Sequence, residues 1–341
     1  MQTNSSEPVI APRRGRASAD GPVHLVQLAQ VVERYYRDGE TKSAIAKSLG
    51  LSRFKVARLL DEAVSRGLVR VEISMPESTL DLRLSDAVRR RFGLRQAIVT
   101  AARGLPPDLR RQELGAIAGS VLAESVDEDS VVGIAWGRSL DKVATSLPAL
   151  PGCTVVQVIG GVSGVGISLN SYDLVRRVAA RSGGEIFAFH APLIAPDAST
   201  AQSLKRDPEV ARALEQFQRL TCAVVAIGSW DPMDSMMAQS FGPELRGSIT
   251  AAGVIADIGA SLIDRDGRTV RTPIDDRRVA ISGTQLRAVP EIIAVAGGIE
   301  KAEAIRAALV GGWATTLVTD AEVAEALLGG SDDAGGGTGG D

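Results

Sequence analysis

The sequence predicts an α/β protein in which an N-terminal helix-turn-helix unit, similar to a winged helix, precedes a larger domain with a mainly parallel β-sheet. Of the 341 residues, 45% are hydrophobic and only 4% are aromatic, so Val, Ile, Leu and Ala must fill the interior, as in buried parallel sheets. Short apolar runs alternate with helical stretches from Ser130 onward, a pattern typical of βα units. Residues 1–75 carry 12 Lys or Arg against 8 Asp or Glu, whereas residues 76–341 carry 26 against 33. The two parts therefore differ in charge as well as in pattern.

Five segments are expected along the chain. Residues 1–22, rich in Ser, Pro and Arg, are predicted to be a disordered arm. Residues 23–75 form the helix-turn-helix unit, residues 76–92 a connector helix, and residues 93–328 the larger domain. Residues 329–341 are a Gly-rich tail that cannot form a core.

Three helices and a strand are predicted in the N-terminal unit, each helix bounded by capping or helix-ending residues. The helices are expected over Val23 to Arg37, Thr41 to Gly50 and Ser52 to Gly67, and the strand over Leu68 to Ser74. The second and third helices are separated only by a short turn with a glycine. This spacing is typical of a helix-turn-helix, whose second helix can lie in the major groove of DNA.

The packing expected for this motif leaves basic residues exposed. The apolar residues predicted to pack between its helices are Ala44, Ile45 and Leu49 against Val56, Leu59 and Leu60. The stretch from Thr41 to Leu60 holds five Lys or Arg and no acidic residue, which favours a surface that faces phosphates over a merely solvated helix face. Contacts to operator DNA are predicted for Thr41, Lys42, Ser52, Arg53, Lys55 and Arg58. Because so small a unit normally reads two half-sites, we expect a homo-oligomer.

Two strand ends of the larger domain are candidate anion sites, since parallel sheets bind ligands beyond the carboxyl ends of their strands. In each, glycine precedes a helix whose first amides could bind a phosphate. The candidate residues are Gly137, Arg138 and Ser139 at one end, and Gly297, Gly298 and Lys301 at the other. The alternative is that glycine and serine occur at these strand-to-helix turns only because the backbone geometry requires them, without binding a ligand.

Polar residues at two further places are candidates for binding a polar ligand. Gly160 and Gly161 permit a tight turn between Gln157 and Asn170, which could recognise hydroxyl groups. Asp257 lies within the apolar run GVIADIG, where an unpaired carboxylate is costly unless it meets a ligand. The alternatives are a flexible loop and a structural hydrogen bond of Asp257 to a neighbouring loop.

Several classes of protein are disfavoured. The sequence has neither a Walker A loop nor a dinucleotide fingerprint, and its two histidines, His24 and His190, offer no His-rich metal site, so no cofactor or metal is expected. Cys153 and Cys222 precede β-branched runs and are predicted to be buried thiols. No apolar stretch reaches the length of a membrane span, about 18 residues. We expect a cytoplasmic protein without a membrane partner.

The motifs in this order resemble the SorC/DeoR family of sugar-binding transcriptional regulators. They are KSAIAKSLGLSRFKVARLLDEAVSRGLVRVEI, VVGIAWGRSL, VVQVIGG, GVIADIGASLIDRDG and VAGGIEKAEAIRAAL. The resemblance spans Val23 to Leu328 and implies an effector domain similar to sugar-phosphate isomerases and glucosamine-phosphate deaminases. It implies a dimer or tetramer that responds to a phosphorylated sugar.

The resemblance also implies roles for the strand-end residues. The effector phosphate would lie near Gly137 to Ser139, with Gly297 to Lys301 closing the pocket, and sugar hydroxyls would meet Asp257, Gln157 and Asn170. The chain departs from the family at two points. Ile159 stands where some relatives carry a lysine able to form a Schiff base, so covalent capture is not expected, and Ser171-Tyr172 follows Asn170 where Asn-Pro is frequent.

The function predicted from the sequence is an effector-gated, DNA-binding regulator of carbohydrate metabolism, and not an enzyme. The alternative is a sugar-phosphate isomerase or deaminase with an attached DNA-binding unit. His190 is the only histidine of the larger domain, and acid-base chemistry on such sugars needs a suitable proton-transfer group. A purely architectural DNA-binding protein would leave the Gly-rich strand ends and Asp257 without a role.

Overall fold

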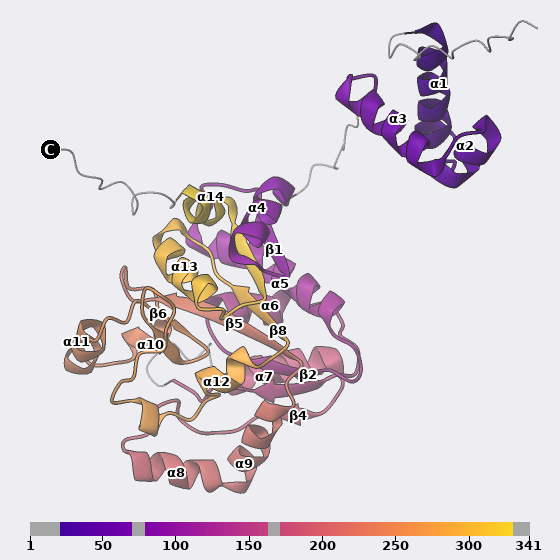
Figure 1. Cartoon of the computed structure of the whole chain (residues 1–341). Coiled ribbons are helices and arrows are strands. Elements are labelled where there is room, and N and C mark those ends of the chain that lie inside the picture. Colours follow the sequence, from indigo (N-terminus) through magenta and orange to yellow (C-terminus); the bar gives the residue numbers. More distant parts are fainter. Residues whose placement is uncertain (1–20, 70–78, 163–170, 330–341) are drawn as a thin grey trace, which may run out of the picture. The chain divides into compact units, whose positions relative to one another are not determined.

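The computed structural model describes residues 21–69, 79–162 and 171–329. The chain divides into two compact units, Met1–Pro76 and Glu77–Asp341 (Figure 1). Most of the predicted arm, tail and strand over residues 68–74 lies outside the described residues. Each unit is described by itself.

The smaller unit consists of helices, and its bounds follow from capping residues. They are α1 (Pro22–Val32), the π-helical turn Glu33–Arg37, α2 (Lys42–Leu49) and α3 (Arg53–Ser65). The Thr41 hydroxyl caps α2 by accepting a hydrogen bond from the Ala44 amide at 3.2 Å, and the Ser52 hydroxyl caps α3 by accepting one from Lys55 at 3.1 Å. Gly50, between them, has φ +64°, a conformation that favours glycine.

The core of this unit lies between its three helices. Its buried residues are Leu28, Val31, Ile45, Ala46, Val56, Leu59, Leu60 and Ala63. The expected packing is confirmed except at one position, because Ala44 is exposed and Ala46 is buried in its place. Ala44 lies in the first turn of α2, on the face of the helix that is exposed to solvent. Ala46, next to the buried Ile45, lies on the face that packs in the core.

The larger unit is built on one sheet with strand order β1-β9-β8-β5-β2-β3-β4, and all neighbours in this path are parallel. The mainly parallel α/β fold is therefore confirmed. The strands are β1 (Gln96–Thr100), β2 (Val131–Ile134), β3 (Thr154–Gln157), β4 (Ile186–Phe187), β5 (Cys222–Ser229), β6 (Ala256–Ile258), β7 (Ser261–Ile263), β8 (Glu291–Val295) and β9 (Thr316–Asp320).

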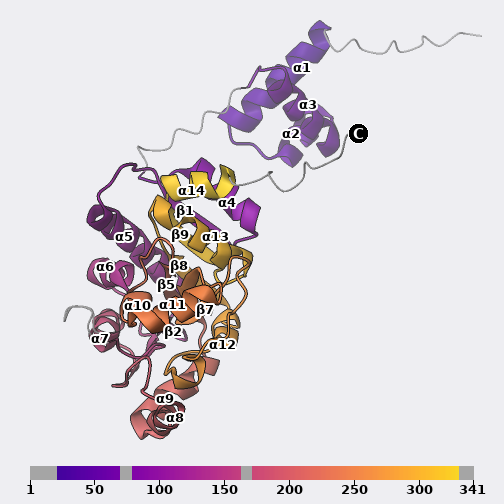
Figure 2. The ribbon, with the colours of Figure 1, turned by 90° about the vertical axis from the view of Figure 1, so that its left-hand side faces the viewer.

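Helices cover both faces of this sheet (Figure 2). The α-helices are α4 (Leu82–Phe92), α5 (Pro107–Ser125), α6 (Arg138–Ser146), α7 (Ser171–Ser182), α8 (Ala198–Arg206), α9 (Pro208–Glu215), α10 (Met236–Gln239), α11 (Pro243–Ala251), α12 (Gly283–Arg287), α13 (Ala302–Val310) and α14 (Ala321–Gly329). Single 3-10 turns occupy Gln216–Gln218, Asp275–Arg277 and Ile299–Lys301. Helices α5, α6 and α7 lie on one face of the sheet, and α4, α13 and α14 lie on the other.

Two expectations for this unit are corrected. The helix predicted as a connector over residues 76–92 packs against β1 and α14, and it belongs to the larger unit because Leu84 and Val88 bury their side chains in its core. The alternation of strands and helices expected from Ser130 onward is interrupted at the run GVIADIGASLID. This run folds into the antiparallel pair β6 and β7, which extends from β5, because the turn at Gly259 and Ala260 has positive φ angles that reverse the chain.

The strand order places a topological switch point between β2 and β5. From β2 the chain continues outward to β3 and β4, whereas from β5 it continues through β8 to β9 in the opposite direction. The helices that follow such strands leave a crevice at their carboxyl ends, where open α/β sheets bind ligands.

Cys153 and Cys222 are buried and form no disulfide. Burial raises the pKa of the Cys222 thiol to about 12, so this residue is a packed side chain without thiolate character. Among the described residues, no helix is long and apolar enough to cross a membrane, and no group of three metal-ligating side chains gathers.

Candidate functional site

A polar pocket lies at the switch point, beyond the carboxyl ends of β2, β5 and β8. The space within it, together with the open solvent at its mouth, amounts to about 770 Å³. Six predicted residues line it: Gly137, Arg138, Ser139, Asp257, Gly297 and Lys301. Residues that the sequence did not indicate line it as well, among them Arg110, Arg111, Trp136, Asp234, Met236, Met237 and Glu300.

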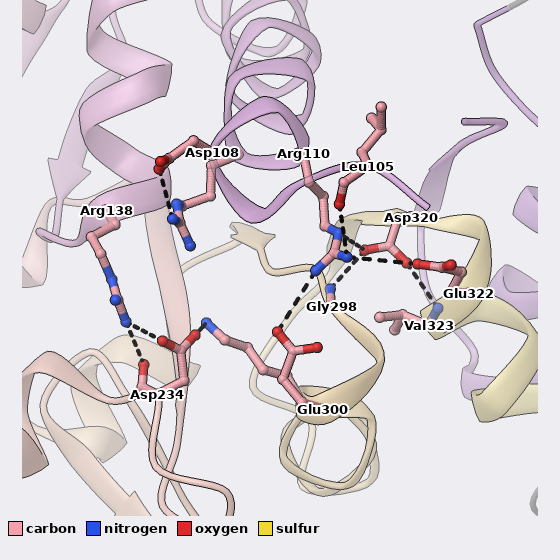
Figure 3. Close-up of polar contacts among 12 residues, drawn as sticks. Leu105, Asp108, Arg110, Arg138, Asp234, Gly298, Glu300, Asp320, Glu322 and Val323 are labelled. Carbon is pink, nitrogen blue, oxygen red and sulfur yellow. Dashed lines mark hydrogen bonds and ion pairs between the residues drawn. The ribbon is translucent and has the colours of Figure 1, made fainter. Parts of the chain in front are cut away.

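Two of the predicted cations meet at a single carboxylate in this pocket. The Lys301 ammonium lies 2.6 Å from Oδ2 of Asp234. The Arg138 guanidinium contacts Oδ1 of the same side chain and donates a hydrogen bond of 3.0 Å to the Asp234 carbonyl (Figure 3). Three adjacent strands bring these groups together, because Arg138 follows β2, Asp234 follows β5 and Lys301 follows β8.

The charge of Asp234 is stabilised by these partners. Burial of the carboxyl opposes its ionisation, but the charges and hydrogen bonds of Lys301 and Arg138 outweigh that effect and hold its pKa below the usual value. The side chains of Lys301 and Arg138 are 12% and 33% exposed, so the ion pair with Lys301 is better shielded from water than the one with Arg138. Asp234 thus occupies the place at which an anionic ligand would meet both cations.

Asp257 lies on the β6–β7 hairpin and lines the same pocket. Its Oδ1 accepts a hydrogen bond of 2.9 Å from the Trp230 indole, and Ser235 also bonds its carboxyl. Burial nevertheless raises the pKa of Asp257. The carboxyl fits closely, since a Cβ added at Gly228 would lie 2.5 Å from its Oδ1. A partly satisfied carboxyl in a polar pocket is suited to hydrogen bonding with hydroxyl groups.

Arg110, on α5, adds a further cation to the pocket wall. Its guanidinium lies 3.6 Å from Glu300, 3.6 Å from Asp320 and 3.7 Å from Glu322, and it donates a hydrogen bond to the Leu105 carbonyl (Figure 3). The negative charge of these three carboxylates outweighs the single positive charge of Arg110. Arg138 and Lys301, which share one carboxylate, are therefore the better anion-binding pair.

The glycine pair after β8 is not the open anion cradle that the sequence predicts. The Gly298 amide donates a 2.7 Å hydrogen bond to Oδ2 of Asp320, so that donor is already used. Gly298 has φ +102°, and a Cβ at Gly297 would lie 2.6 Å from the same Asp320 oxygen. The two glycines therefore make room for Asp320, and only Lys301 of this group presents a charge to the pocket.

The expected hydroxyl-binding roles near β3 are not supported by the geometry. The Gln157 amide is buried and donates to the Ile159 carbonyl at 3.0 Å and to Ser171 at 3.3 Å, while its oxygen accepts from the Phe189 amide at 3.1 Å. These bonds hold neighbouring loops together, so Gln157 is a structural residue.

The glycines after β3 are likewise structural. A Cβ at Gly160 would lie 2.8 Å from the Pro192 carbonyl, and the Gly161 amide donates to Ala191. Neither glycine lines the pocket at the switch point. Asn170 lies outside the described residues.

The predicted DNA-contacting residues gather on the smaller unit. Thr41, Lys42 and Arg53 line one shallow hollow together with Tyr35 and Tyr36. Arg53 and Arg58 are exposed and Lys55 is half-buried. Within residues 21–69, none of these three cations forms an ion pair, so their charge is available to a polyanion.

Fold and site together define a class of protein: a ligand-binding α/β domain preceded by a small helical unit with a basic third helix. Comparison with known proteins specifies the family. The Sugar-bind family, described as a "Putative sugar-binding domain", matches residues 77–329. The chain belongs to this family.

Several proteins similar to this chain are named as transcriptional regulators. The transcriptional regulator LsrR of Escherichia coli (strain K12) is 29% identical over 316 residues, which cover 91% of this chain and 97% of LsrR. The deoxyribonucleoside regulator of Bacillus subtilis (strain 168) is 25% identical over 301 residues, covering 86% and 94%. The crystal structure of the full-length sorbitol operon regulator SorC from Klebsiella pneumoniae matches with a TM-score of 0.70 and 26% identity, covering 89% of this chain and 98% of SorC. The resemblance to SorC/DeoR regulators rather than to enzymes is thereby confirmed.

Proposed function

We propose that the chain is a DNA-binding transcriptional regulator of carbohydrate metabolism whose operator binding is controlled by a phosphorylated sugar. The observation that carries this proposal is the meeting of Arg138 and Lys301 at one point of the pocket, with Asp257 on its wall. Two cations suit a phosphate, and a carboxyl suits sugar hydroxyls. Two relatives are named a deoxyribonucleoside regulator and a sorbitol operon regulator, which supports an effector related to carbohydrates.

The effector phosphate would compete with Asp234 for Arg138 and Lys301. Binding would then release the Asp234 carboxylate, which lies only a few residues from Trp230, the hydrogen-bond partner of Asp257. The phosphate and the sugar hydroxyls therefore act on the same segment after β5. A ligand that binds one arrangement of this segment more tightly shifts the population toward it.

The DNA-binding part of the proposal rests on the uncompensated cations of α3 and its cap. Ser52, Arg53, Lys55 and Arg58 would face the major groove, and Thr41 and Lys42 would contact phosphates. Because two half-sites are normally read together, the regulator would act as a dimer or tetramer in the cytoplasm. An allosteric coupling of about 1–3 kcal/mol would change operator affinity roughly 5- to 150-fold.

A thermal-shift screen with free and phosphorylated sugars tests the effector part. Ligand that binds only the folded state raises the melting temperature. We expect a shift with a phosphorylated sugar that is absent with its free sugar, is lost in Lys301→Ala and Asp257→Ala, and persists in the control Lys142→Ala, whose side chain does not line the pocket. A shift that survives both pocket substitutions would overturn the assignment of the site.

Turnover of the phosphorylated sugar by the purified protein would instead support the isomerase or deaminase alternative. His190 does not line the pocket, and it lies 3.5 Å from Glu209 with 65% of its side chain exposed. Among the described residues, no histidine lines the pocket, so no histidine there favours that alternative.

A further inference from the structure

Phe54 is the most exposed large hydrophobic side chain of the described residues. It is the second residue of α3, and 82% of its surface is accessible. The Ser52 cap fixes the first turn of the helix, so this exposure belongs to a regular helical residue. Sequence reasoning assigned a role to its polar neighbours but not to Phe54.

The surroundings of Phe54 are cationic. Arg53 precedes it, and Arg58 lies one turn further on the same face of the helix, where residues four apart are neighbours. Both arginines are exposed and have no ion-pair partner within residues 21–69. Val56 and Leu59 bury the opposite face of α3 in the core of the unit. An apolar ring flanked by free cations therefore points away from the fold.

We propose that Phe54 recognises the 5-methyl group of thymine in the major groove of the operator. This inference rests on the proposed DNA-binding function of the smaller unit. Residues in the first turn of a recognition helix reach base edges, and thymine is the one standard base that presents a methyl group in the major groove. The cations bring the ring to the duplex, and the ring can gain free energy there only by apolar contact.

A contact with a second protein surface would suit this environment less well. It would bury Arg53 and Arg58 beside the ring, and burying unpaired charges is costly. A DNA duplex satisfies both features at once, because its strong negative charge attracts the arginines while the thymine methyl meets the ring.

The experiment uses the full-length protein and two kinds of duplex. Sequences bound by the wild type are first selected from a pool of random duplexes. In the best selected duplex each thymine is then replaced singly by uracil, which removes only the methyl group. Affinities are measured for the wild type, Phe54→Ala, Phe54→Leu and Arg58→Ala. Since Phe54 packs against nothing in the core, its variants should melt at the wild-type temperature.

We expect one or two thymines in each half-site at which uracil weakens wild-type binding about fourfold, the effect of burying one methyl group. Phe54→Ala should bind the thymine and uracil duplexes equally, whereas Phe54→Leu should retain part of the difference. Arg58→Ala should weaken binding to both duplexes alike and reduce its salt dependence, while keeping the preference for thymine.

Two results would overturn the inference while leaving the proposed function intact. In one, the wild type selects a sequence but binds every uracil-substituted duplex as tightly as the parent. In the other, Phe54→Ala keeps the full preference for thymine. A selection that enriches no sequence would overturn both the proposed function and this inference.

Discussion

At the scale of single residues, the pocket holds two carboxyls whose environments act in opposite directions. The pKa of Asp257 is raised because burial outweighs its hydrogen bonds, whereas that of Asp234 is lowered because Lys301 and Arg138 outweigh its burial. The charge of Asp257 is thus a cost to the folded state, and the charge of Asp234 stabilises it. Replacing aspartate by asparagine is therefore predicted to have opposite effects on stability at the two positions.

Asp257→Asn is expected to stabilise the protein while weakening effector binding. The amide removes a desolvated charge but keeps an oxygen that can accept from the Trp230 indole. We expect the melting temperature at pH 8 to rise by roughly 2–4 °C, as for about 1 kcal/mol in a domain of this size. Since the raised pKa favours the protonated wild type at low pH, the gain should shrink as the pH falls. Asp129→Asn, at an exposed turn, is the control; an equal gain there would refute the explanation.

Asp234→Asn is expected to destabilise the protein, by about 1–3 kcal/mol at pH 7, because Lys301 and Arg138 lose their charged partner. The lowered pKa means that the wild type has this stabilisation above the unfolded pKa and loses it as the pH falls through the folded pKa. Denaturant unfolding at pH 7 and at acidic pH should therefore show a difference that disappears in acid.

The same variant should bind inorganic phosphate at least about tenfold more tightly than the wild type, since a like charge a few ångströms from the anion is removed. Titration calorimetry at constant ionic strength measures this. Unchanged or weaker phosphate binding would show that Asp234 does not compete for the two cations.

Sequence reasoning found some of these residues and missed others for physical reasons. Asp257 was recognisable as an acid within an apolar run, and Lys301 and Arg138 as cations after strands. Asp234 lies in the polar turn WDPMDS, where an acid is unremarkable by composition. Arg110 lies in the first turn of α5, among other charged residues. Their roles arise from strand order, which places the ends of β2, β5 and β8 side by side.

At the scale of elements, the turn between α2 and α3 determines how the third helix is presented. Gly50 adopts φ +64°, and the space that a Cβ would occupy there is open, so only backbone strain opposes a side chain at this position. Gly50→Ala is expected to cost about 1–2 kcal/mol, and Gly50→Asn less, because Asn tolerates this conformation. Hydrogen exchange of the amides over residues 42–65 measures both. Equal protection in the two variants would contradict the strain argument.

Single strands and helix caps were predicted better than the pairing of strands and the contacts between distant residues. The apolar runs of β2, β5 and β8 and the caps at Thr41 and Ser52 follow from local sequence. The antiparallel β6–β7 hairpin could not be predicted in this way, since its apolar residues fit a buried parallel strand equally well. The occupation of the Gly298 amide by Asp320 is a contact over 22 positions, beyond the reach of local pattern.

At the scale of the whole molecule, each unit has a hydrophobic core of its own. Calorimetry of the full chain is therefore expected to show two unfolding transitions. A phosphorylated sugar should move only the unfolding transition of the larger unit to higher temperature. At a concentration a hundredfold above its Kd, it should raise the free energy of unfolding of that unit by about 2.7 kcal/mol. A single transition that moves as a whole with the sugar would indicate instead that the two units unfold cooperatively.

The carboxylate that bridges Lys301 and Arg138 also has a consequence for signalling. Every cell contains sulfate, inorganic phosphate and organic acids that two bare cations would attract without discrimination. A tethered carboxylate is a competitor of high effective concentration, so such background anions are held off. In the proposed mechanism, only a metabolite that also gains contacts at the far wall of the pocket would displace Asp234. Asp234 would thereby reserve the site for the specific effector.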